Sequence, residues 1–143
     1  MIPTPIPRAT AAAITARSKS EDRRVAFRAG RAAESAVAGD LAQKGLAILG
    51  TNVRLGRLEI DVVARDDDTV VVVEVRTRGA SAWQTGLESI ARAKAKRVRA
   101  AGERLWRERF LRDPSVNRMR FDVAVVTFDE RGSPLIEYAR GVL

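Results

Sequence analysis

The chain of 143 residues contains no cysteine and no histidine. The lack of cysteine excludes disulfide bonds, and the lack of both residues excludes zinc fingers, imidazole metal sites and the Ser-His and Cys-His catalytic pairs. Any metal must therefore be held by carboxylate and carbonyl oxygens, which suit hard ions such as Mg²⁺ or Mn²⁺. We expect a metal enzyme of this composition to act on phosphates.

Long apolar runs are also missing. No stretch approaches the ~20 apolar residues that a membrane span requires, so we expect a soluble protein with no membrane partner. The N-terminal region has no continuous apolar stretch after Arg8 that would resemble a secretion signal, and we expect a cytoplasmic protein. The 26 Lys and Arg outnumber the 18 Asp and Glu by eight. This excess favours a polyanionic partner.

The hydrophobic periodicity predicts a tail over residues 1–20 and one α/β domain over residues 21–143. The tail holds three of the five prolines and little that could be buried. Two helices and five strands are predicted in the domain, and their order indicates a mixed sheet flanked by helices. The helices are Glu21–Lys44 and Leu87–Leu111, and the strands are Ala47–Arg54, Leu58–Ala64, Val70–Arg76, Phe121–Phe128 and Leu135–Tyr138.

Acidic residues lie inside two of these apolar strands. Side chains alternate across a strand, so Glu59 and Asp61 are predicted on one face and Ile60 and Val62 on the other. Burying unpaired charges costs several kcal/mol, so such acids indicate a metal, a cation or a solvent-filled cleft. Simple ion pairs with arginines at the margin of the sheet remain an equal alternative.

The next strand carries Glu74 and Arg76 on a common face. If the turn at residues 66–68 closes a hairpin, Asp61 and Glu74 approach each other on neighbouring strands. Asp122, in the strand after the second helix, is predicted to form a structural ion pair or a turn contact.

Five segments resemble one bacterial protein family. They are Gly30–Glu34, Leu58–Ala64, Val70–Arg78, the helical Lys94 and Arg120–Val123, and together with their separations they are similar to the YraN-type proteins, also called UPF0102. The resemblance covers about residues 24–140. It implies a restriction-endonuclease-like core of the PD-(D/E)xK class, similar to archaeal Holliday-junction resolvases, and a nuclease activity.

The resemblance also implies roles for individual residues. It makes Asp61 and Glu74 the metal-binding acids, with Glu34 completing the acidic site. Arg76 stands where the motif has lysine, so it can clamp a phosphate but cannot act as a base.

Three further positions bear on the same site. The carbonyl of Val75 is the expected third metal ligand. Lys94 is a candidate replacement for the motif lysine, with a solvated helix charge as the alternative. Leu58 replaces a glycine of the family pattern.

The basic second helix is the predicted nucleic-acid surface. Arg92, Lys96 and Arg97 can neutralise phosphates along its side, and a solvated helix face is the alternative that explains many of its charges. Gln84, in the loop before this helix, is a further candidate contact.

These patterns predict a metal-dependent endonuclease, or a nuclease-like binding protein, that acts on structured or branched DNA with Mg²⁺ or Mn²⁺. Two alternatives stay open: a non-catalytic DNA-binding module, because of Arg76, and a protein-interaction subunit whose acids only form ion pairs. A homodimer would suit the cutting of two strands by analogy with the fold.

Overall fold

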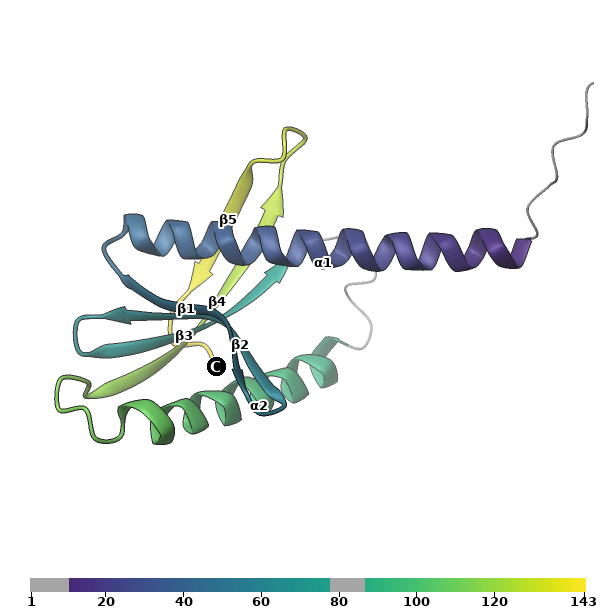
Figure 1. Ribbon diagram of the computed structural model, residues 1–143. Coiled ribbons are helices and arrows are strands. Elements are labelled where there is room, and N and C mark those ends of the chain that lie inside the picture. Colours follow the sequence, from purple (N-terminus) through teal and green to yellow (C-terminus); the bar gives the residue numbers. More distant parts are fainter. Residues whose placement is uncertain (1–10, 78–86) are drawn as a thin grey trace, which may run out of the picture.

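A computed structural model describes residues 11–77 and 87–143. The chain forms a long helix, three strands, a second helix that ends in a π-helical turn, and two more strands (Figure 1). These elements are α1 (Ala11–Gln43), β1 (Ala47–Leu55), β2 (Leu58–Asp66), β3 (Thr69–Thr77), α2 (Leu87–Leu105), η1 (Trp106–Phe110), β4 (Arg118–Phe128) and β5 (Pro134–Ala139). The first helix begins at Ala11, inside the segment that the sequence predicted as a tail.

The five strands form one mixed sheet in the order β1-β2-β3-β4-β5. β3 and β4 are parallel and the other neighbours are antiparallel. A parallel pair needs a long crossover connection, which α2 supplies between β3 and β4. The predicted α/β class, with a mixed sheet flanked by helices, is confirmed, and this arrangement is consistent with a restriction-endonuclease-like fold.

The two helices cover opposite faces of the sheet. On one face, Val37 and Leu41 of α1 pack with Val71 and Val73. On the other, residues of α2 such as Leu105 pack with the valines that alternate with these on β3. Residues 70–73 are therefore fully buried, which explains the uninterrupted valine run. No helix in residues 11–77 and 87–143 is long and apolar enough to cross a membrane.

The β1–β2 hairpin bends at Asp61. Ile60 belongs to the core under α2, whereas Val62 belongs to the core under α1. The prediction that these two side chains share a face is therefore wrong. Asn52, which lies opposite the bend on β1, has a φ of 50°. The pairing of β2 with β3 also ends at Val62 and Val73, so β2 separates from β3 at Asp61 while it stays paired with β1.

Asp122 holds the far side of the sheet together. Its carboxylate is fully buried and accepts hydrogen bonds from Arg120 Nε (2.9 Å), Tyr138 Oη (2.6 Å) and Gly141 N (2.8 Å). These contacts join β4, β5 and the chain that follows β5. The prediction of a structural ion pair at this aspartate is confirmed.

We expect Asp122→Ala to lower the free energy of unfolding by about 3–5 kcal/mol, because it leaves the Arg120 guanidinium without its buried partner. Tyr138→Phe removes one neutral donor and should cost about 1 kcal/mol. Urea denaturation at pH 7 measures both values. An equal loss in the two variants would contradict the central role of the carboxylate.

Candidate active site

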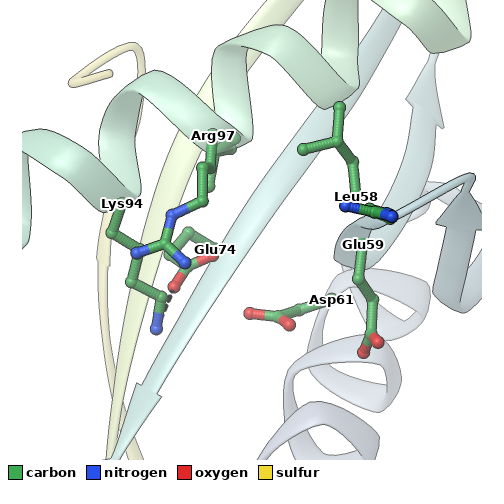
Figure 2. Close-up of a pocket in the computed structure, with 8 residues that line it drawn as sticks. Leu58, Glu59, Asp61, Glu74, Lys94 and Arg97 are labelled. Carbon is green, nitrogen blue, oxygen red and sulfur yellow. Dashed lines mark ion pairs between the residues drawn. The ribbon is translucent and has the colours of Figure 1, made fainter.

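A cleft of about 420 Å³ opens between the β1–β2 hairpin, β3 and α2 (Figure 2). Acids from the strands lie at its floor and margin, and cations from the hairpin turn and from α2 form its walls. The lining residues are Arg57, Leu58, Glu59, Asp61, Glu74, Lys94, Arg97 and Val98. The cleft therefore joins a buried acid, Glu74, and a half-buried one, Asp61, to a basic entrance.

Asp61 and Glu74 meet where β2 leaves β3. The Val75 N–H donates a hydrogen bond to Asp61 Oδ2 at 2.9 Å, so the carboxylate serves as the acceptor at the point where the strand pairing ends. Burial, followed by the negative charge of Glu74, raises the pKa of Asp61 from 3.8 to about 6. The two predicted metal-binding acids are thus brought together, at a cost in free energy when both are ionised.

Lys94 offsets part of this cost. Its Nζ lies 2.6 Å from Glu74 Oε1, and Figure 2 shows the side chain descending from α2 toward the carboxylate. No hydrogen-bond donor of the described residues reaches this oxygen with suitable angles, so its compensation comes from the ion pair. The lysine side chain is 46% exposed while Glu74 is buried. The ammonium can therefore leave the acid without crossing the protein interior.

Glu34 lies beside the cleft and is not among the residues that line it. The Asn52 side chain hydrogen-bonds to its carboxylate, while burial and the charge of Asp61 raise its pKa, burial being the larger cause. Glu34 is thus close enough to Asp61 for their charges to interact, although it does not line the cleft. Sequence reasoning missed Asn52, whose signal was an asparagine inside a strand, a residue type that tolerates positive φ.

The remaining predicted residues differ in where they lie relative to the cleft. Arg97 lines the cleft, whereas Arg92 and Lys96 are exposed elsewhere on α2. Arg76 follows Glu74 by two residues, and its buried Nε has no hydrogen-bond partner among residues 11–77 and 87–143. Gln84 lies outside the described residues.

Arg57 was not predicted as a site residue. It lies in the two-residue turn that joins β1 to β2, after Gly56 with a φ of 65°. The Gly-Arg pair between two strands was a signal for this turn. Its position at the cleft depends on the bend at Asp61, which the sequence pattern did not show.

The donor set fits a hydrated Mg²⁺ or Mn²⁺. Within the described part of the chain no three acids lie close enough to hold a metal ion together. Mg²⁺ commonly takes one or two carboxylates and fills its other positions with water and phosphate oxygens. Asp61 and Glu74 meet that requirement, and a divalent cation would offset the repulsion that raises the pKa of Asp61.

We expect Asp61→Asn to stabilise the metal-free protein above pH 6. Because the folded-state pKa of Asp61 is about 6 against 3.8 unfolded, ionisation costs stability as the pH rises through this window. After allowance for solvent screening, the variant should gain about 1–2 kcal/mol at pH 8 and about a third of that at pH 4.5.

Thermal unfolding in EDTA at these two pH values measures the gain, with Glu130→Gln, an exposed acid in the β4–β5 turn, as the control. A loss of stability at pH 8 would mean that Asp61 is a structural ion-pair partner.

Comparison with known proteins assigns the chain to a family. The model of the "Uncharacterised protein family UPF0102" matches residues 33–126. UPF0102 protein sce2912 of Sorangium cellulosum is 53% identical over 108 residues, which cover 76% of this chain and 75% of the relative. UPF0102 protein SCO5602 of Streptomyces coelicolor is 40% identical over 114 residues, which cover 79% of this chain and 86% of the relative. Asp61, Glu74 and Lys94 all lie inside the matched segment. The match and these identities show that the chain belongs to the UPF0102 family.

Proposed function

We propose that the protein is a metal-dependent endonuclease that hydrolyses phosphodiester bonds in structured or branched DNA. The observation that carries the proposal is the pair of carboxylates, Asp61 and Glu74, at the floor of a cleft whose walls are cationic. A phosphodiester is an anion, and acids alone would repel it. Acids that hold a divalent cation, surrounded by arginine and lysine, form a site for both the metal and the phosphate.

Asp61 and Glu74 would hold the Mg²⁺ or Mn²⁺, with the Val75 carbonyl as a further candidate ligand. When bound there, the cation lowers the pKa of water and polarises a phosphoryl oxygen. The protein orients the two carboxylates. Val75 N–H orients Asp61 through its hydrogen bond, and the bend at Asp61 aims the carboxylate at Glu74 rather than into either core.

The cations of the site bind and hold the phosphate. Arg57 from the β1–β2 turn and Arg97 from α2 both line the cleft, so they can contact the phosphate backbone beside the acidic pair. The guanidinium of an arginine stays protonated, so Arg76 can clamp two phosphoryl oxygens but cannot take a proton. Lys94 can exchange Glu74 for a phosphoryl oxygen, since its stem is flexible and half-exposed.

The preference for branched DNA rests on the resemblance to Holliday-junction resolvases. A second candidate function is a DNA-binding module that does not cleave, and the observation that favours it is Arg76 in place of the motif lysine. Both functions use the same basic cleft, and only the hydrolysis step separates them.

We expect the protein to cleave a four-way DNA junction in the presence of Mg²⁺ or Mn²⁺, and to cleave flapped and linear duplexes more slowly. Asp61→Asn and Glu74→Gln should each reduce the rate by about 100-fold or more, because each removes a charged ligand of the cation. A gel assay of single-turnover rates measures this, with Glu130→Gln as the matched loss of one exposed acid. Cleavage that persists in both site variants would refute the assignment.

We expect Arg76→Lys to raise the cleavage rate by at least about tenfold at unchanged junction affinity. Lysine keeps the positive charge and can also exchange a proton with water, a contribution that reaches 10²–10⁴-fold in general acid–base catalysis. The rate and the dissociation constant are measured on the same junction. A slower Arg76→Lys variant would show that bidentate clamping by arginine matters more than proton transfer. Cleavage seen in the variant and not in the natural chain would establish the non-catalytic function.

A further inference from the structure

The N-terminal half of α1 extends past the sheet. Figure 1 shows the purple half of this helix continuing beyond the strands that its other half covers. In the described part of α1, the first side chain buried in the core is Ala33, followed by Val37 and Leu41. Residues 20–28 are all exposed. We call residues 20–31 the α1 arm. The core does not require the arm, so its side chains are available for another purpose.

The arm is basic on one face. It contains four arginines and two acids, and the acids are confined to its first turn at Glu21 and Asp22. Arg24, Arg28 and Arg31 are spaced by four and then three residues, so they lie on a common face of the helix. They span about 10 Å along the helix axis, a length over which one strand of a DNA duplex presents about three phosphates. The charge and spacing of this face complement a sugar–phosphate backbone.

This basic face leads toward the cleft. Glu34 follows Arg31 by three residues, and three-residue neighbours lie on adjoining parts of a helix surface. The charges of both Arg31 and Asp61 act on the Glu34 carboxyl group, so the end of the arm and Asp61 are both near this residue. A strand bound along the arm would therefore approach the side of the molecule that carries Asp61.

We propose that the α1 arm binds the phosphate backbone of duplex DNA next to the site of cleavage. The proposal rests on the proposed function and deepens it by naming a second contact surface on the protein. The whole arm lies before residue 33, where the match to the family model begins. The arm thus adds to the predicted surface on α2 a contact from the opposite face of the sheet.

The side chains of the arm favour nucleic acid over an anionic membrane surface. A membrane-binding helix needs a broad apolar face opposite its charges. The large exposed apolar residues of the arm, Val25 and Phe27, are two residues apart and so point in different directions. The Arg31 guanidinium also lies 5.1 Å from the centre of the Phe27 ring, which leaves that ring partly covered by a charge.

The test compares two variants that each remove two positive charges. The arm variant is Arg24→Gln with Arg28→Gln, and the control is Arg112→Gln in the turn after η1 with Arg118→Gln at the start of β4. All four arginines are exposed, and glutamine keeps nearly the same helix propensity as arginine. Circular dichroism first checks that both variants retain their helix content.

The probe is a fluorescein-labelled four-way junction with 30-base-pair arms, titrated with the metal-free full chain between 50 and 200 mM NaCl. We expect the slope of log Kd against log salt to fall by about 2 in the arm variant, one unit per lost phosphate contact, and to stay unchanged in the control. Equal slopes in the two variants overturn the proposal while leaving the proposed function standing. A natural chain that fails to bind the junction at 50 mM NaCl overturns both.

A second probe separates the phosphates of DNA from those of lipids. Vesicles of phosphatidylglycerol are sedimented with each protein at 100 mM NaCl. Loss of vesicle binding in the arm variant, combined with an unchanged DNA slope, overturns the proposal in favour of a membrane surface. A lower DNA slope in the arm variant, with no difference in vesicle binding between the two variants, supports it.

Discussion

The mutual repulsion of Asp61 and Glu74 is the constraint on which the rest of the site depends. Burial and the charge of Glu74 together raise the pKa of Asp61 to about 6, so the pair is costly to ionise at neutral pH. A domain that needed these residues only for stability would be better served by apolar side chains at the same places. Under the proposed function, a cation held by the two acids would offset this cost. In that proposal the pair is a binding site whose ligand would add to the stability of the folded protein.

The fold provides both the support for this pair and its access to solvent. Cores on the two faces of β3 hold the strand rigidly through residues 70–73, directly before Glu74. The bend of β2 leaves Val75 N–H without a backbone acceptor on β2, and Asp61 Oδ2 accepts its hydrogen bond instead. Lys94 compensates Glu74 from α2 and remains half-exposed, so it can be displaced. A packed strand beneath Glu74 and a half-exposed lysine above it suit a site that exchanges ligands.

Much of the fold was predictable from the sequence because the local signals agree with the tertiary structure. The valine run of β3, the periodic apolar residues of α1 and α2, and the acidic turn at residues 66–68 each match the observed elements. The pairing of Asp61 with Glu74 followed from the hairpin between β2 and β3. Asp122 was also predicted correctly, since a lone acid beside Arg120 in an apolar strand finds its nearest cation.

The bend at Asp61 was not predictable in the same way. Strict alternation is the default for a strand, and the departure here depends on Asn52 in the opposing strand and on the packing of Ile60 under α2. Both are long-range effects that a single strand does not reveal. The bend also decides that Arg57 lines the cleft and that Glu34 lies near Asp61 without lining it. The beginning of α1 at Ala11 also differed from the prediction. The residues before Glu21 are small and only weakly apolar, so they gave no hydrophobic period from which a helix could be predicted.

The central claim is that Asp61 and Glu74 together bind a divalent cation. Isothermal titration of the metal-free protein with Mn²⁺ at pH 7.5 tests this claim most directly, because it needs neither DNA nor turnover. The account predicts one Mn²⁺ per chain, a rise in thermal stability with Mn²⁺ concentration, and the loss of both effects in Asp61→Asn and in Glu74→Gln. Mn²⁺ binding of unchanged affinity in these variants, or no binding by the natural chain, would contradict it.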